Sequence, residues 1–458
     1  MATKITADTI ADTAGNVLAN KLEKTAPAGA ITNDDIKNWN NAYKVYGVEW
    51  DTTLATTTMK RIGNLALHAS LPVQSLMRRC LLLDNGTVNY YLLATDSTKK
   101  ADGTAALLDG TDGQVMVEMP EHYRLFETEG NKQRALISLF PAAGFTRVPK
   151  SYVSAYEAAV QRSTSKLASV ANTTADYRGG NNAAANDANN NTLLGMAATL
   201  LSRTQFRTYA RARGSIKWNC YLHEVRKTMF WLYYIEYAEM NCQATFNNAL
   251  TAQGYRQGGL GAGVTDAGSS DWSGFNGYYP FVPCGVSNSL GNATGNISYT
   301  PAGWPIAKTF TVPSFRGIEN PFGHLWEWTD GINIKIQAND AGAESQVFIS
   351  NALAMSDSDY VGYTKIGLLP RAEGYMKSLL FINGDMMPAS VGASSTTHWS
   401  DYFYTNIPGS GESLRGVLSG GDAVNGAGAG FGSSYTSHAP SNTFASIGSR
   451  LCYMPEGV

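Results

Sequence analysis

The residue types that most often carry metal or redox chemistry are widely spread along this chain. The five cysteines are odd in number and include no CxxC pair of the kind that marks zinc or redox sites; they are Cys80, Cys220, Cys242, Cys284 and Cys452. His68 and His122 each stand alone, which is more typical of surface or capped histidines than of metal ligands. The spacing therefore predicts buried thiols in place of a disulfide framework.

A glycine-rich segment at residues 420–440 is a second candidate for chemistry. It matches neither GxGxxG nor GxxxxGK[ST], and too little chain follows it for a dinucleotide-binding fold. Glycine permits irregular backbone paths at little steric cost, so such a segment can keep its shape while the side chains that project from it vary. The projecting side chains, including those just beyond the segment, are Asp422, Val424, Ser434, Tyr435, Ser437, His438, Phe444 and Ser446.

We hypothesise that these projecting side chains form a ligand-binding face, the alternative being an ordinary Gly/Ser surface loop. Nearby Trp399, Tyr402 and Tyr404 either extend this face with rigid aromatic contacts or fill the core. The acidic pair Asp357 and Asp359 lies in a polar loop, where carboxylates are expected to be solvated.

The composition indicates a folded, well-buried protein. Of the 458 residues, 43% are hydrophobic and only 16% are charged. The net charge of −2 provides no broad cationic field for a phosphate backbone, so nucleic acid is a poor candidate partner. The N-terminus lacks the basic segment and apolar run of a secretory signal. The most apolar window, residues 229–238, is short and interrupted by Glu236, which predicts a core helix and no membrane insertion.

Residues 1–45 are mostly small and polar and cannot bury a core by themselves. Asn33 is suited to cap a short helix, and this helix would carry an apolar stripe of Ile36, Trp39 and Tyr43. A stripe with no partner nearby in the sequence predicts docking against copies of itself or against another protein. We favour a trimeric attachment helix, the alternative being that the stripe packs on the next domain.

Two further parts follow. Residues 46–140 contain strand-like runs at 88–93, 115–119 and 135–140 with turn residues between them, which predicts a small β-rich domain of antiparallel hairpins. In residues 141–458, a strand passing into a helix is expected at 151–160, a buried helix at 224–242 and an exposed loop at 179–191. Short strands and irregular loops fill the remainder, so the predicted class is α+β.

The segment Glu-Asn-Pro-Phe-Gly-His-Leu-Trp-Glu-Trp-Thr-Asp at 319–330 resembles the Asn-x-x-Gly-Asn-Val-Trp-Glu-Trp motif of the formylglycine-generating-enzyme branch of C-type-lectin-like folds. Residues 152–161 look like the entry strand and helix of that branch. Ser-Ile-Gly-Ser-Arg-Leu-Cys at 446–452 looks like its closing strand. The resemblance implies a C-type-lectin-like domain with long irregular loops over most of residues 141–458.

Residues 47–51, 255–261, 272–277 and 414–421 resemble gut-phage tail proteins, whose relatives include the variable proteins of diversity-generating retroelements. In those relatives, error-prone reverse transcription rewrites adenines in a C-terminal coding segment. Mutated AAC or AAT codons never give Trp, Lys, Glu or Met, and residues 420–448 contain none of these four. The resemblance implies that the projecting side chains of this segment are variable ligand contacts.

The lectin-like motif also implies a cation site. In the family, the spacing of Asn320, Gly323, Leu325 and Glu327 offers an amide oxygen, two backbone carbonyls and a carboxylate. Oxygen-only ligation suits Ca²⁺; the alternative is a turn held by hydrogen bonds alone. The family's enzymes are not implied, because neither Cys284 nor Cys452 has a second cysteine beside it and the histidines match no HxxxHxE spacing. No catalysis and no required cofactor are expected.

These observations predict a phage tail adhesin, made in the host cytoplasm and carried at the tail tip of the virion. A homotrimer would bind a bacterial surface protein or glycan at the lectin-like face and a tail or baseplate protein at its N-terminal end. The alternatives are a divergent formylglycine-type oxidase, a polysaccharide-degrading tailspike and a structural baseplate protein that binds no host. The tailspike would require a β-solenoid repeat or a convincing pair of carboxylates, and the sequence shows neither.

Overall fold

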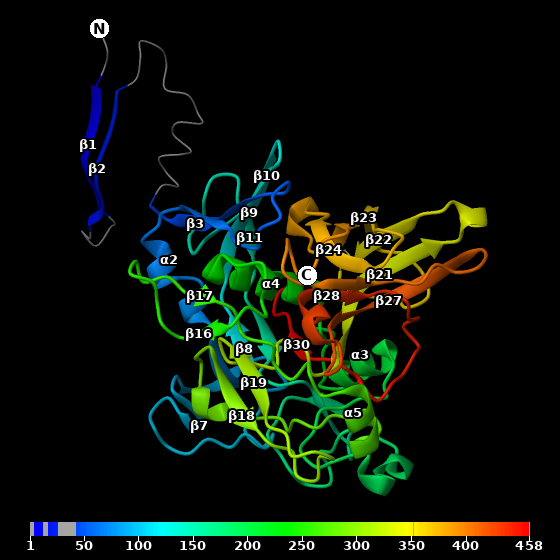
Figure 1. Cartoon of the computed structure of the whole chain (residues 1–458). Helices are drawn as coiled ribbons and strands as arrows, with labels where there is room; N and C mark the ends of the chain where they lie inside the picture. Colours follow the sequence, from blue (N-terminus) through cyan, green and yellow to red (C-terminus); the bar gives the residue numbers. More distant parts are fainter. Residues whose placement is uncertain (1–3, 12–16, 26–42, 351, 458) are drawn as a thin grey trace.

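The computed structural model describes residues 4–11, 17–25, 43–350 and 352–457 of the chain (Figure 1). Strands account for 36% of it and helices for 13%, which confirms the predicted α+β class and shows that β structure dominates. The α-helices of the described part are α2 (Leu67–Ser70), α3 (Arg203–Arg211), α4 (His223–Tyr237) and α5 (Ser269–Asn276). None of them combines the length and apolar character that a membrane crossing requires.

At the N-terminal end, β1 (Lys4–Ala11) and β2 (Val17–Thr25) pair as an antiparallel hairpin. The expected attachment helix falls almost entirely on residues 26–42, outside the described residues, and Tyr43 is the one described member of its apolar stripe. The trimeric helix therefore stays a prediction. Residues 1–45 nevertheless contain more β structure than an attachment helix alone would provide.

Two antiparallel sheets contain the strands expected in residues 46–140. The first has the order β11 (Thr146–Val148), β9 (His122–Glu129), β10 (Lys132–Ser138), β3 (Val45–Asp51) and β4 (Lys60–Gly63). The second has the order β15 (Trp218–Cys220), β30 (Leu451–Tyr453), β12 (Ser151–Ser154), β8 (Gln114–Met119), β5 (Arg78–Leu82), β6 (Val88–Leu93) and β7 (Asp96–Lys100). Strands from both sides of residue 140 therefore share both sheets, and the expected boundary there cuts through them.

A third, nine-stranded sheet contains the Trp-Glu-Trp motif. Its order is β23 (Tyr363–Leu368), β22 (Ser345–Ser350), β21 (Trp326–Gln337), β27 (Glu412–Gly420), β28 (Gly430–Tyr435), β26 (Tyr402–Tyr404), β24 (Gly374–Leu379) and β25 (Pro388–Val391), with β29 (Ile447–Gly448) parallel to β21. Smaller sheets are formed by β13 (Ala159–Gln161) with β14 (Lys166–Ala168), by β16 (Phe246–Asn247) with β17 (Gln257–Gly258), and by β18 (Gly295–Tyr299), β19 (Phe310–Phe315) and β20 (Ile318–Glu319).

Helix α4 lies in the middle of the molecule (Figure 1), and every residue of it except Glu224 is buried. Trp231 stacks on Trp50 with ring centroids 5.7 Å apart, and its indole N–H donates to the carbonyl of Gly384 at 2.6 Å. Trp50 belongs to β3, so the earliest strand of the two β-sheets packs into the same core as the central helix. The predicted buried helix at 224–242 is confirmed, although it ends at Tyr237, where Ala238 adopts a left-handed conformation.

The strand-to-helix transition expected at 151–160 is wrong in its second half. β12 is followed by a bend and by β13, with no helix. The backbone donors that a helix would use internally are taken by distant segments: the N–H of Ala155 donates to Val115 and that of Ala158 to Ser449. The strands expected at 88–93, 115–119 and 135–140 are confirmed as β6, β8 and β10.

The shared sheets predict that residues 46–140 do not fold as an isolated fragment. Without residues 141–458, β8 loses its neighbour β12, and Trp50 loses the α4 side of its core. An expressed fragment of residues 46–140 should give the collapsed amide dispersion of an unfolded chain in a proton–nitrogen NMR spectrum. A dispersed spectrum with cooperative unfolding would instead establish an independent domain.

Candidate functional site

Six aromatic side chains form a continuous row near the C-terminal end of the chain, which we call the aromatic row: Tyr375, Tyr402, Tyr404, Tyr435, His438 and Phe444. Successive ring centroids are 5.0, 4.5, 5.3, 4.7 and 4.8 Å apart. All six are partly exposed or exposed, and Phe444 has an exposed fraction of 43%. The predicted face residues Tyr402, Tyr435, His438 and Phe444 are thus brought together.

Strand pairing aligns the first four rings. Tyr402 and Tyr404 are two residues apart on β26, so both side chains point to the same face of the sheet. In the register of the sheet, Tyr375 of β24 lies opposite Tyr402 and Tyr435 of β28 lies opposite Tyr404. Cross-strand neighbours of this kind are the closest side-chain pairs on a sheet face.

The last two rings belong to the loop after β28. His438 makes an edge contact with Tyr435, and its carbonyl accepts a hydrogen bond from the N–H of Gly416 on β27. The carbonyl of Phe444 accepts from the N–H of Leu200. Burial lowers the pKa of His438, so its imidazole is neutral at pH 7. The row therefore presents ring faces and hydroxyls without a formal charge.

Buried side chains beneath the row fix its geometry. Trp326, the first Trp of the motif, contacts Tyr404 and Tyr435 with centroid distances of 5.7 and 5.6 Å. Gly428 lies close to two of the tyrosines, because a Cβ atom there would come within 3.2 Å of Tyr402 Cβ and of the Tyr404 hydroxyl. A larger residue at position 428 would displace the tyrosines, so the glycine frame has a packing role.

Three predicted face residues lie under the surface. Trp399 is 1% exposed and packs against Trp50, Phe230 and Trp231, so it fills the core, the second of the two roles its sequence position allowed. Ser434 is fully buried and accepts a hydrogen bond from the Arg226 guanidinium. Asp422 is also buried. Val424, Ser437 and Ser446 remain exposed or partly exposed beside the row.

Asp422 anchors the turn that begins the glycine-rich loop. Its Oδ1 accepts from the N–H of Val424 at 3.2 Å, and its own N–H donates to Asn425 Oδ1 at 2.6 Å. Burial raises the pKa of this carboxyl to about 6, against the lowering effect of the Val424 hydrogen bond. A carboxyl that is easier to protonate in the folded state makes the loop more stable at acid pH.

Two of the four residues implied as cation ligands, Asn320 and Glu327, contact a protein cation. The Nε of Arg450 lies 2.7 Å from Glu327 Oε1, and its Nη2 donates to the carbonyls of Glu319 at 2.7 Å and Asn320 at 2.5 Å. Burial raises the pKa of Glu327, which weakens it further as a ligand. A calcium site gathers several anionic oxygens, and here the single carboxylate of the set already faces a guanidinium. The Asn320 amide oxygen is buried without a hydrogen-bond partner and is free to bind a cation, but the set has no carboxylate that is not already paired with Arg450, so it fits Ca²⁺ poorly.

Other chemically suggestive residues are structural. His324 is buried, with Nδ1 2.5 Å from Glu157 Oε2, and its Nε2 accepts from the backbone N–H groups of Phe281 and Val282. His68 and His122 are buried, not on the surface, and each bonds to a backbone carbonyl. All five cysteines are free thiols, four of them buried and Cys284 partly buried.

Among the described residues, no group of three or more His, Cys, Asp and Glu side chains is placed to hold a metal ion. Asp357, expected to be solvated, instead pairs with the buried guanidinium groups of Arg203 and Arg207. Arg203 and Arg207 also pair with Asp330 of β21, so helix α3 and the Asp357 loop are joined to the nine-stranded sheet.

Tyr375 is the row member that sequence reasoning missed. No local pattern marks it, since its place in the row depends on the pairing of β24 with β26. Tyr404 was named from the sequence together with Tyr402. Both lie in the row, and Phe403 between them is buried.

No protein-family model matches the chain, and no curated protein sequence matches it.

Because Arg450 already pairs with the Glu327 carboxylate, calcium should not stabilise the protein. Melting temperatures measured by calorimetry in 2 mM CaCl₂ and in 2 mM EDTA, concentrations chosen as about a thousandfold above a micromolar Kd, should agree within error. A rise of several degrees with calcium would show that Glu327 binds the ion in spite of Arg450.

Asp422 should make stability depend on pH. Its folded-state pKa of about 6 lies above the ordinary Asp value of 3.8, so the folded state binds more protons and stability falls as pH rises between these values. The loss is on the order of 3 kcal/mol and is complete above pH 6. Asp422→Asn should remove this slope and stabilise the protein at pH 7, as measured by urea unfolding from pH 4 to 8. The exposed Asp266 provides a control, Asp266→Asn, which should leave the slope unchanged; an unchanged slope in Asp422→Asn would contradict the assignment.

Proposed function

We propose that this protein is a phage tail adhesin that binds a bacterial surface protein or glycan through the aromatic row, carried on a C-type-lectin-like domain over most of residues 141–458. The observation that supports this best is the row itself. Its six rings come from three strands and one loop. Each ring contacts the next one in the row, and all six are at least partly exposed to solvent.

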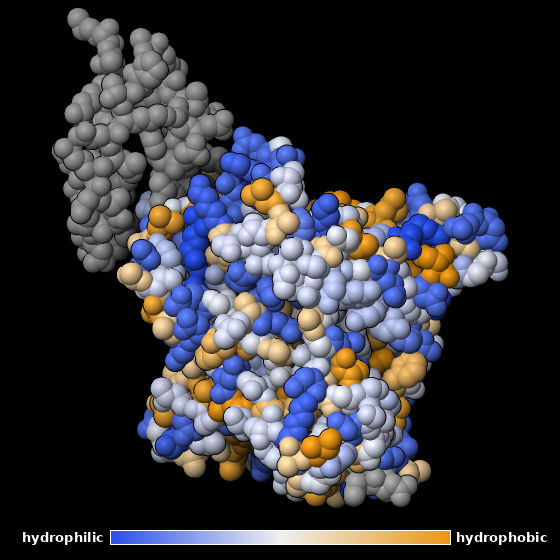
Figure 2. Space-filling model, viewed as in Figure 1, coloured by the Kyte–Doolittle hydropathy of each residue, from blue (hydrophilic) through white to orange (hydrophobic). Residues whose placement is uncertain are grey.

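Partly exposed aromatic rings are efficient contacts. Tyrosine offers a large, rigid, amphipathic surface with few rotatable bonds, so ordering it on binding costs little entropy. Contiguous exposed apolar groups are also uncommon on monomeric proteins unless they bind something. On the face drawn in Figure 2, hydrophobic residues are scattered among hydrophilic and neutral ones instead of forming a broad patch. The aromatic row is therefore better suited to bind a receptor than the scattered hydrophobic residues of that face are.

The glycine-rich frame supports a variable contact surface. Val424, Ser437 and Ser446 are exposed or partly exposed, whereas Asp422, Ser434 and Trp399 are buried. In a diversity-generating retroelement system, the open positions would be the ones exchanged, and the buried ones would hold the loop in place. The absence of Trp, Lys, Glu and Met from residues 420–448 is compatible with that history.

Oligomerisation would complete the mechanism. Three copies joined at their N-terminal segments would raise the effective concentration of each face, so modest single-site affinity would hold a virion on a cell. A tail or baseplate protein would bind at the same N-terminal end. Adhesion of this kind requires no catalysis and no cofactor.

Loss of three rings should abolish cell binding. In the variant Tyr435→Ala/His438→Ala/Phe444→Ala, labelled protein should no longer bind bacterial strains that bind the wild type, as measured by flow cytometry over a strain panel. The folded state should persist, because all three side chains are partly exposed or exposed.

The matched control is Ile306→Ala/Val361→Ala, which removes two exposed hydrophobic side chains outside the row and should bind cells as the wild type does. Full binding by the triple variant would remove the row from the proposal. Absence of wild-type binding across the panel would remove adhesion itself.

A further inference from the structure

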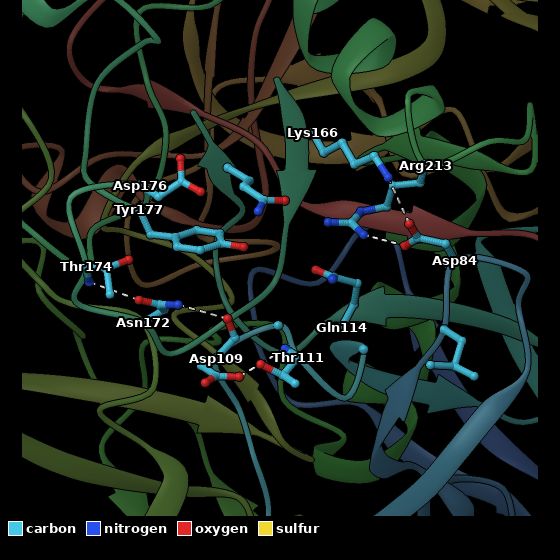
Figure 3. Close-up of a pocket in the computed structure, with 14 residues that line it drawn as sticks. Asp84, Asp109, Thr111, Gln114, Lys166, Asn172, Thr174, Asp176, Tyr177 and Arg213 are labelled. Carbon is cyan, nitrogen blue, oxygen red and sulfur yellow. Dashed lines mark hydrogen bonds and ion pairs between the residues drawn. The ribbon is translucent and has the colours of Figure 1, made fainter. Parts of the chain in front are cut away.

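A second candidate site is a pocket of about 590 Å³ that shares no residue with the aromatic row (Figure 3). Its walls are the turn after β5, the loop before β8, the β13–β14 hairpin, the loop at residues 172–177 and Arg213 just beyond α3. The volume lies within the range of about 300–1,000 Å³ that is usual for small-molecule sites. The pocket is thus large enough for a ligand of two or three sugar rings.

The lining is unusually polar. Of the fourteen lining residues drawn in Figure 3, all but Leu83, Gly110 and Gly113 carry polar side chains, and Tyr177 supplies the single aromatic ring. An apolar ligand would strip water from these groups without replacing its hydrogen bonds, which costs free energy. A ligand with many hydroxyls replaces them, so the lining selects a polyhydroxylated molecule.

One side of the pocket is positively charged. Arg213 Nη1 lies 2.5 Å from Asp84 Oδ1, and Lys166 Nζ lies 3.2 Å from Asp84 Oδ2. Two cations therefore share one carboxylate, which leaves an excess positive charge. Arg213 is buried and fixed by a further hydrogen bond from its Nε to the Leu167 carbonyl at 2.6 Å. Figure 3 shows Lys166, Arg213 and Asp84 together on one side.

The opposite side carries acceptors. Figure 3 places Asp109, Asn172 and Asp176 there, with the Tyr177 ring extending from this side toward Arg213. Asp109 accepts from the N–H of Thr111 at 2.9 Å, a hydrogen bond that lowers the pKa of the carboxyl. The pKa of Asp176 is also lowered, because hydrogen bonds from Ser163 outweigh the opposing effect of burial. Both carboxylates are ionised and held in place at neutral pH.

We propose that this pocket binds an acidic saccharide that carries one carboxylate. The ligand carboxylate pairs with Lys166 and Arg213, and the sugar hydroxyls donate to Asp109 and Asp176 on the other side. Charge-assisted hydrogen bonds to Lys and Arg are the stronger part of such recognition. The acidic side disfavours ligands with anionic groups at both ends. The inference stands apart from the proposed adhesion through the aromatic row.

The test uses two matched pairs of sugars on the full-length protein: 3′-sialyllactose against lactose, and cellobiouronic acid against cellobiose. In isothermal titration calorimetry at low salt, at least one acidic sugar should bind about tenfold more tightly than its neutral partner. Lys166→Gln should remove about this tenfold preference and leave the melting temperature close to that of the wild type, since the Lys166 side chain is 32% exposed.

A matched control is Lys365→Gln. Lys365 pairs with Glu344 at the same 3.2 Å distance and is 43% exposed, but it lies outside the pocket, so its variant should bind as the wild type does. The triple variant of the aromatic row should also keep full sugar binding, which separates the two proposals. Binding of neither acidic sugar at millimolar concentration, equal binding of acidic and neutral partners, or unchanged affinity in Lys166→Gln would each overturn the inference.

Discussion

The buried guanidinium of Arg450 joins the two largest sheets. Just before it, residues 447–448 form β29, which pairs with β21 in the nine-stranded sheet, and the three residues that follow it form β30, which lies between β15 and β12 in the seven-stranded sheet. At this crossing, Arg450 pairs with Glu327 of the Trp-Glu-Trp motif and donates to the carbonyls of residues 319 and 320. Breaking a buried ion pair by removing one partner typically costs about 3–5 kcal/mol, because the other charge is left unpaired. The motif and the closing segment are thus two halves of one interaction.

Non-local packing explains why the sequence predicted elements better than it predicted their arrangement. Strands β6, β8 and β10 and helix α4 follow from local alternation and apolar runs, and they lie close to where they were expected. The expected boundary at residue 140 depended on a change of local pattern, which does not reveal that Trp50 stacks on Trp231 or that β8 pairs with β12. The helix expected after residue 154 was lost for the same reason, since distant carbonyls took its backbone donors.

In the candidate site too, the local elements were predictable from the sequence and their arrangement was not. The glycine-rich segment and its aromatic residues were recognisable because glycine and tyrosine are informative locally. Their sorting into open and buried positions was not, since Ser434 and Tyr435 are adjacent in sequence and only the first is fully buried. Tyr435 is the last residue of β28, and the five residues before it in the strand are all buried, so the difference depends on where the strand leaves the core near Arg226. Likewise, the implied calcium ligands could be read from spacing, but the arginine that faces them comes from a segment more than a hundred residues away.

The proposed binding surface, with contacts that are exchanged, would need a support that does not depend on them. Here the row lies on Trp326, whose strand β21 continues directly into Glu327 and therefore into the Arg450 pair. The rings of Tyr435, His438 and Phe444 are partly exposed or exposed and lie outside the Arg450–Glu327 pair, so replacing them would change the surface and leave that pair in place. Buried support and exposed side chains are also separate in the polar pocket. Arg213 is buried and fixed by contacts with a backbone carbonyl and with Asp84, whereas Lys166 is partly exposed. In both places, buried charges and rings set the geometry, and exposed side chains set the chemistry offered to a ligand.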